Sequence, residues 1–258
     1  MKTSDSPYLH LLWELTRTEF QLRDQGTVLG FLWTLLHPAL MFTVLYFLFT
    51  RWMGRFVDNY APYLLIGIVQ YQFFDKTTCY SLASLRRKGN LVRNFKFPKE
   101  IIVLSTVGSN LWSYLLEMAI LLVFLLFVGF RPTTAWLLLP LAVLNLVIFT
   151  LGVSLLLSLI ATEYQDLERV WGIVTTAGFY LTPVFYPLSI LAENRQALLR
   201  LNPMTHHLDS IRACLMPGAE IHPVGPPVIL VAGIFMCLAA LKAFYLYDSR
   251  ITDRLLEP

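Results

Sequence analysis

The sequence predicts an all-α integral membrane protein, with an N-terminal interface helix and six transmembrane helices. Of its 258 residues, 56% are hydrophobic and only 14% are charged, whereas a typical soluble domain has about 25% charged residues. A soluble protein of this size could not bury so much apolar surface in one core. Stretches poor in charge recur along the chain, each near the roughly 20 apolar residues that a membrane crossing needs. This composition excludes an ordinary soluble enzyme, a disordered chain and a disulfide-stabilised secreted module.

Residues 1–28 predict an amphipathic helix at the membrane interface. Trp13, Phe20 and several leucines fall on one face of a helix, while Glu14 and Arg17 fall on the other. A cleavable signal peptide is not indicated, because the segment has no continuous apolar region. Apolar aromatic residues opposite charged ones are typical of a helix that lies on a membrane. A helix packed on the protein's own cytoplasmic surface is the alternative.

Six membrane crossings are predicted within one transmembrane domain covering residues 1–258. Pro183 and Pro187 interrupt the fifth crossing near its end, so five or seven crossings are the alternatives. The predicted spans are 30–50, 60–85, 101–130, 134–161, 170–191 and 223–247.

The distribution of Lys and Arg predicts that both termini are cytoplasmic. Seven Lys and Arg residues fall between positions 76 and 99, after the second span. Cytoplasmic loops carry an excess of these residues. With six spans the N-terminus and C-terminus lie on that same side.

Two cytoplasmic segments are candidates for docking a partner protein. The first follows the Gly89-Asn90 turn signal, where apolar and basic residues interleave in a short amphipathic helix that ends before Pro98. A helix lying on lipid explains that pattern equally well. The second segment, 162–171, is acidic and suits either a basic partner surface or a solvated turn.

Residues 188–217 predict two short helices on the outer side, too brief to cross the membrane. Asn202 is a good N-cap and Pro203 a good first helical residue, so a helix begins there, and Pro217-Gly218 ends it. It would carry His206 and Arg212. The segment is a candidate outer gate.

Catalytic, metal and cofactor sites are not indicated. The chain lacks a P-loop motif. His206 and His207 are adjacent, diverge on a helix and make a poor metal pair. Glu117 falls inside the third span, where a structural role is preferred to proton coupling. Asp75 and Lys76 are expected to pair with each other near the cytoplasmic interface. Net charge is only +3, which does not favour nucleic acid as a partner.

Aromatic residues concentrate on two of the spans. They either form interface belts and core packing or line a path in which sugar rings stack on aromatic faces, and the sequence does not separate these interpretations. The residues on the first span are Phe42, Tyr46 and Phe49, and those on the fifth are Phe179, Tyr180, Phe185 and Tyr186.

Four stretches together resemble the permease subunit of ABC type-2 polysaccharide exporters, which include O-antigen, capsule and teichoic acid transporters. The similarity covers nearly the whole chain. One departure is Glu163-Tyr164-Gln165-Asp166, where the family commonly has Arg-Tyr-Arg-Asp. The stretches are 29–49, 89–102, 161–187 and 201–212.

The resemblance implies a homodimer that works with two copies of a separate P-loop ATPase subunit, which binds ATP and Mg. The chain itself would hold no cofactor and would not be an enzyme. The first and fifth spans would line a path for a lipid-linked glycan or polyol phosphate in a bacterial inner membrane, and Asn202, Pro203, His206 and Arg212 would belong to the outer gate. Contacts with the ATPase would come from Leu91, Val92, Arg93, Phe95, Lys96, Phe97, Pro98, Tyr164 and Asp166.

Other functions stay open on the sequence alone. One is a drug or small-lipid efflux permease of the same superfamily. A second is a proton-coupled flippase for lipid-linked glycans, which needs more buried charge than Glu117. A third is a membrane enzyme, for which a converging set of acids, histidines or metal ligands is not found in the sequence.

Overall fold

The computed structural model describes residues 7–22, 32–95, 97–217 and 225–247, and every regular element in these ranges is a helix. This confirms the all-α fold class. The helices are α1 Pro7–Leu22, α2 Leu32–Met53, α3 Tyr60–Arg87, α4 Gly89–Asn94, α5 Glu100–Phe127, α6 Leu139–Glu163, α7 Leu167–Leu181, α8 Glu193–Leu199, α9 Pro203–Leu215 and α10 Gly225–Leu246, with short 3₁₀ turns at Thr134–Leu138 and Leu188–Ile190.

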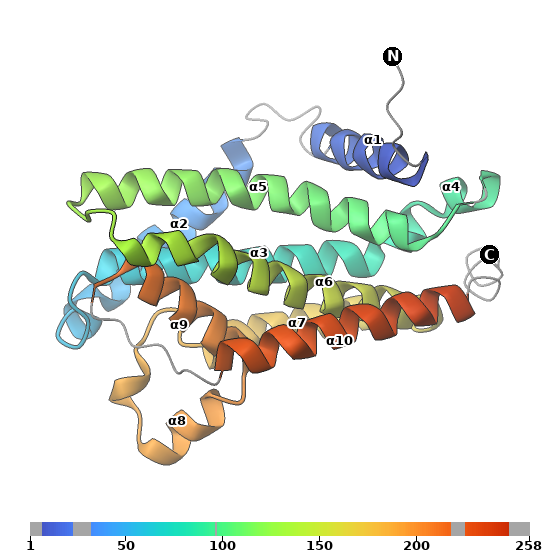
Figure 1. Ribbon diagram of the computed structural model, residues 1–258. Helices are drawn as coiled ribbons and strands as arrows, with labels where there is room; N and C mark the ends of the chain where they lie inside the picture. The colour runs from blue at the N-terminus through green and yellow to red at the C-terminus, as the bar shows by residue number, and fades with distance from the viewer. Residues whose placement is uncertain (1–6, 23–31, 96, 218–224, 248–258) are drawn as a thin grey trace.

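The long helices form a bundle around α3, which packs against α2, α5, α6 and α7 (Figure 1). Most of α3 is buried, including the polar residues Gln70, Gln72 and Thr77. A membrane helix that is surrounded by other helices can carry polar side chains, because those side chains meet protein and not lipid. This burial explains how α3 can be long and yet only moderately apolar.

Four described helices are long and apolar enough to cross a membrane. They are Leu32–Met53, Glu100–Phe127, Thr134–Glu163 and Gly225–Leu246. α3 has 28 residues but carries more polar and charged side chains than these four, and α7 has only 15 residues. The structure thus establishes a polytopic helical membrane protein, and the number of six crossings stays a prediction.

The fifth predicted span, 170–191, extends ten residues beyond the end of the helix that the structure has there. α7 begins at Leu167 and stops at Leu181, where Thr182 takes up extended backbone ahead of Pro183. Proline disfavours helical backbone in the residue before it and cannot donate the next helical hydrogen bond. The residues beyond this point are still largely apolar, which is why composition alone placed the end of the helix too late. The third span also ends earlier than predicted, at Phe127.

The α6–α10 pair shows why small residues recur in these helices. A Cβ placed on Gly152 would lie 2.9 Å from Met236 Cβ and 3.0 Å from the carbonyl oxygen of Gly233. A Cβ on Gly233 would lie 3.1 Å from the backbone of Phe149. The two helices approach closely only because both positions lack a side chain, as is common where membrane helices pack.

α1 lies along α5 at the end of the bundle that also carries α4 and the last turn of α10, whereas α8 and α9 lie toward the other end (Figure 1). Its Thr16 is buried against α5 near Gly108, and its Trp13 packs edge-on against Trp112 with ring centroids 6.3 Å apart. Tyr8, Leu9 and Trp13 are more than half exposed. The rest of the predicted interface helix, 1–6 and 23–28, lies outside the described residues.

Candidate translocation path, outer gate and coupling surface

The predicted path aromatics of α2 and of the segment after α7 meet near the end of the bundle that carries α9. Phe42 stacks on Tyr46 at 5.4 Å between ring centroids, and Tyr46 stacks on Tyr60 of α3 at 6.2 Å. Phe49 contacts Phe185 at 5.1 Å. Residues more than a hundred positions apart in sequence therefore form one aromatic cluster.

Not all of the predicted aromatics have the same surroundings. Phe179 is buried, only 7% exposed, and packs on Tyr71 and Phe185. Tyr180 is 59% exposed. Phe185 and Tyr186 are half-buried and contact each other at 5.0 Å. Phe179 thus belongs to the packed core of this chain, while Tyr180 faces away from it.

Tyrosine hydroxyls of α3 hold the extended segment that follows α7. The Tyr60 hydroxyl donates to the carbonyl of Phe185 at 2.9 Å, and the Tyr63 hydroxyl donates to the carbonyl of Tyr186, also at 2.9 Å. These carbonyls have no helical partner because the helix has already ended. The aromatic side chains of Phe185 and Tyr186 are positioned through their own backbone.

Arg212 of α9 is the centre of this outer arrangement. It is 2% exposed, and its guanidinium donates to the carbonyls of Pro183 at 2.7 Å, Val184 at 2.8 Å and Tyr63 at 3.2 Å. It also lies over the ring of Tyr63, 3.5 Å from the centroid. A planar guanidinium with several fixed donors can satisfy several carbonyls at once, which a lysine cannot do. Arg212 therefore joins α9, α3 and the end of α7.

Gly67 of α3 makes room for this contact. A Cβ at this position would lie 2.6 Å from the Arg212 guanidinium and 2.7 Å from the carbonyl oxygen of Val184. Any larger residue would have to displace either the guanidinium or the backbone beneath it. Nothing in the local sequence around Gly67 indicates this role, because its contacts come from α9 and from the segment after α7.

The predicted start of the outer helix is confirmed. The side chain of Asn202 accepts from the Met204 amide as an N-cap and donates to Thr182 Oγ1 at 2.8 Å, so it too touches the end of α7. Pro203 is the first residue of α9. His206 Nε2 lies 2.7 Å from the carbonyl of Arg200.

The two adjacent histidines have different surroundings. His207 is buried against Phe149, and this burial lowers its pKa to about 3, with the neighbouring His206 acting in the same direction. His207 is thus neutral in the folded protein at ordinary pH. Within the described residues, no group of three or more His, Cys, Asp and Glu side chains could hold a metal ion.

The first predicted docking segment forms a short helix that ends earlier than expected. α4 stops at Asn94, and Phe95 is extended, so the predicted helix up to Pro98 is wrong. α4 has only six residues, about one and a half turns. A helix this short is not stable without packing, and it does not continue past Asn94. Lys96 lies outside the described residues, and so does the side chain of Arg93.

The apolar residues of this segment divide into buried and exposed ones. Val92 is buried in a small cluster with Leu85 and Phe244, and the half-buried Phe97 packs against the same cluster. Leu91 and Pro98 are both half-buried. Phe95 is 63% exposed. The segment is thus anchored by Val92 and Phe97, and it presents Phe95 outward.

The second predicted docking segment lies beside the first. The Arg86 guanidinium donates to the carbonyl of Gln165 at 3.4 Å, and Arg87 lies 3.7 Å from the Glu168 carboxylate. Tyr164 is 67% exposed, and Asp166 is also exposed.

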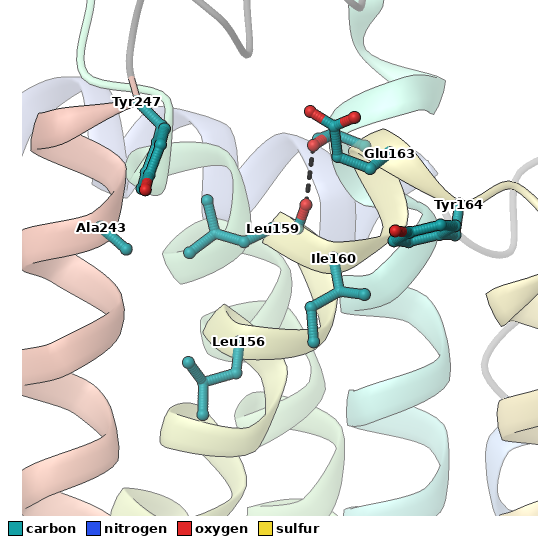
Figure 2. Close-up of a pocket in the computed structure, with 8 residues that line it drawn as sticks. Leu156, Leu159, Ile160, Glu163, Tyr164, Ala243 and Tyr247 are labelled. Atoms are coloured by element: carbon teal, nitrogen blue, oxygen red, sulfur yellow. Dashed lines mark hydrogen bonds between the residues drawn. The ribbon is translucent and has the colours of Figure 1, made fainter.

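Tyr164 borders a cavity of about 500 Å³ between the last turns of α6 and α10, where Leu156, Leu159 and Ile160 lie toward Ala243 and Tyr247 (Figure 2). Both segments therefore share one end of the bundle.

A buried ion pair joins α3 to α5. Lys76 Nζ lies 3.3 Å from Glu117 Oε1, and the Glu117 side chain is only 5% exposed. The expected pairing of Lys76 with Asp75 is wrong, because adjacent residues on a helix point about 100° apart. One helical turn away, Tyr114 donates to Gln70. The sequence did contain a signal for the pairing of Lys76 with Glu117. The two residues have opposite charges and lie in neighbouring predicted spans, and a charge inside a membrane needs a partner.

These features define the class of the protein: a polytopic α-helical membrane domain, with an aromatic cluster at one end of the bundle and the short helix α4 between α3 and α5 at the other. A family profile of ABC-2 type transporters matches residues 10–216. The chain therefore belongs to the ABC-2 type transporter family.

Three relatives make the comparison more specific. The chain is 30% identical to the O-antigen export system permease protein RfbA of Myxococcus xanthus, over 94% of this chain and 93% of that protein. It is 27% identical to an O-antigen export system permease protein RfbA of Klebsiella pneumoniae, over 94% of each chain. It is 22% identical to the polysialic acid transport protein KpsM of Escherichia coli, over 74% of this chain and 75% of that protein.

Proposed function

We propose that this chain is the channel-forming subunit of an ATP-driven exporter, which moves a lipid-linked polysaccharide of the O-antigen, capsule or teichoic acid type across a bacterial inner membrane. The observation that carries the proposal is the similarity to an O-antigen export permease along nearly the full length of both chains. The aromatic cluster of α2 and the segment after α7 supports it, because aromatic faces suit sugar rings.

ATP hydrolysis belongs to a separate subunit in this proposal. The sequence has no P-loop motif, the element with which a P-loop ATPase cradles nucleotide phosphates. Two copies of a P-loop ATPase would bind ATP and Mg and contact the cytoplasmic end through the exposed Phe95, Tyr164 and Asp166. The anchored residues Val92 and Phe97 would pass the resulting motion to α3 and α10, since they pack in the cluster with Leu85 and Phe244.

The functional unit in this proposal is a homodimer with six crossings per chain and cytoplasmic termini. α2 supports the homodimer, because only 11% of its most apolar stretch is buried within one chain. Its exposed side chains include Phe47 at 82% and Trp52 at 68%. A face of this kind on α2 meets either lipid or the second copy, and a path between two copies would use it.

The buried pair Lys76–Glu117 favours this passive permease over a proton-coupled flippase. A proton relay requires a chain of groups that gain and lose protons in turn. Glu117 instead has a basic partner at 3.3 Å, Lys76, on the neighbouring helix α3. We therefore assign the pair to holding α3 and α5 together.

The proposal is tested by depleting the chain in its native host. Surface polysaccharide should fall while lipid-linked polymer accumulates at the inner face of the membrane, and re-expression of the wild-type chain should restore export. The matched pair of variants is Phe95→Asp, which changes the exposed docking residue, and Leu137→Asp, which changes a residue that is 81% exposed and belongs to none of the proposed sites. Normal surface polymer after depletion would contradict the proposal, and a change in drug sensitivity alone would favour a drug efflux permease.

A further inference from the structure

A second cavity, of about 470 Å³, lies where α1 crosses the ends of α3 and α5. Its volume is within the range of about 300–1,000 Å³ that is usual for small-molecule sites. Eight of its nine lining residues are polar or charged. They are Glu19 and Leu22 from α1, Tyr80, Ser84 and Arg87 from α3, Lys88 at the end of α3, and Thr106, Ser109 and Asn110 from α5.

One wall of the cavity is already satisfied internally. The Glu19 carboxylate accepts from the hydroxyls of Thr106 at 3.1 Å and Ser109 at 3.3 Å, and it contacts the Lys88 ammonium. Both Glu19 and Lys88 are largely buried. The charges of this pair cancel, so the pair fixes the shape of the wall without attracting an ion of either sign.

Arg87 supplies the charge that a ligand would meet. Its guanidinium lies 5.7 Å from the centroid of the Tyr80 ring, and its partner Glu168, at 3.7 Å, does not belong to the cavity wall. Both members of that ion pair are at least half exposed, so it contributes little free energy and exchanges readily. Arg87 can therefore turn to an anion in the cavity at small cost.

The cavity lies beside a helix whose first half is typical of the membrane interface, which suits a lipid headgroup as its ligand. α1 forms one side of it, and this helix exposes Tyr8, Leu9 and Trp13, residues typical of the membrane interface. The cavity offers a cation beside hydroxyl and amide groups. That combination matches a phosphate ester linked to a polyol, because the guanidinium binds phosphate oxygens and the neutral groups bind hydroxyls.

We propose that this cavity binds the headgroup of an anionic glycerophospholipid of the phosphatidylglycerol type, with its phosphate at Arg87 and its glycerol hydroxyls at Ser84 and Asn110. Such a lipid would fasten α1 to the α3–α5 pair. A polyprenyl diphosphate carries more negative charge than one exchangeable arginine balances, so the phospholipid is the better match. The site goes beyond the export function and does not depend on it.

The test is native mass spectrometry of the purified protein, with whatever subunits accompany it, from nanodiscs of phosphatidylethanolamine containing phosphatidylglycerol. R87Q removes the cation that faces the cavity. R86Q is the matched control, because Arg86 precedes it on the same helix and does not line the cavity. Asn110→Leu, nearly isosteric, removes a polar group from the opposite wall.

Phosphatidylglycerol should remain bound to the wild type and to R86Q. Its occupancy should fall at least about fivefold in R87Q, as expected for the loss of one basic contact to an anionic lipid, and should also fall in Asn110→Leu. An equal loss in R86Q and R87Q would overturn the site in favour of general surface charge. Retention in both cavity variants, or polyprenyl diphosphate found in place of phosphatidylglycerol, would overturn it as well. Since the readout is bound lipid, it does not depend on export.

Discussion

Replacing Arg212 with methionine keeps much of the side-chain volume but removes the guanidinium donors that bind the carbonyls of Pro183 and Val184 after α7. The carbonyls of Pro183 and Val184, which accept at 2.7 and 2.8 Å, would stay buried with one partner fewer. Hydrogen bonds from charged donors contribute about 1.5–3 kcal/mol each. Losing these two therefore predicts a decrease of about 3–6 kcal/mol in the free energy of unfolding.

The assay combines a denaturant titration in detergent with measurement of surface polysaccharide in the native host. Arg212→Met should lower both stability and export. Arg212→Lys should recover only part of each, since an ammonium does not reproduce the planar fork that reaches two carbonyls together. Arg200→Met, at an exposed arginine just before α9, is the matched control and should stay within about 0.5 kcal/mol of the wild type.

The reasoning about Arg212 would be refuted by an Arg212→Met variant that unfolds like Arg200→Met and exports normally. A variant that is destabilised but exports normally would leave the contact as packing alone and remove Arg212 from the gate.

Three further predictions follow from the same structure. Phe95→Asp should reduce export and leave the melting temperature unchanged, because Phe95 is 63% exposed. Phe97→Asp should reduce export and also lower the melting temperature, because Phe97 packs against a buried cluster. Equal melting temperatures for the two variants would argue against an anchored Phe97 and an exposed Phe95. Lys76→Met should cost up to about 3 kcal/mol of unfolding free energy by removing the cationic partner of the buried Glu117 side chain, and adding Glu117→Met should restore most of it. A double variant as unstable as the sum of the singles would contradict the ion-pair account. Between pH 7 and pH 5 the free energy of unfolding of the wild type should fall by about 2 kcal/mol relative to that of His207→Leu. The reason is that His207 takes up a proton near pH 6.5 in the unfolded chain but only near pH 3 in the folded protein. Parallel curves of unfolding free energy against pH for the two proteins would show that His207 is not held neutral.

Features with local causes could be predicted from the sequence. The start of α9 depends on Asn202 and Pro203, which cap and begin the helix through their own side chains, and the structure has both in those roles. The all-helical membrane class depends on composition and on the length of apolar stretches. Both kinds of signal are contained within a short window of the chain.

Features that depend on contacts between distant segments could not be predicted. Lys76 and Glu117 are 41 residues apart, and Arg212 is 149 residues from its acceptor Tyr63. Their pairing is fixed by how α3, α5 and α9 pack, which the apolar pattern of the sequence does not report. The early end of α7 has a local cause, because Pro183 lies just beyond it. The prediction placed the end of this helix too late because the residues after Pro183 are largely apolar.

The candidate site divides in the same way. The sequence indicated the aromatic positions and the two segments for which we propose docking, since each has a distinct composition. It did not indicate that Phe179 is core while Phe95 is exposed, because burial depends on neighbours elsewhere in the chain. The cavity beneath α1 likewise needs three helices to form.

The central claim is that this chain moves its cargo with energy supplied by a separate ATPase. Purification of the tagged chain from its native host in mild detergent, followed by mass spectrometry of the bound proteins, tests it most directly. The account predicts a P-loop ATPase in equal amount to the chain. A folded, monodisperse preparation that contains no such ATPase would contradict it.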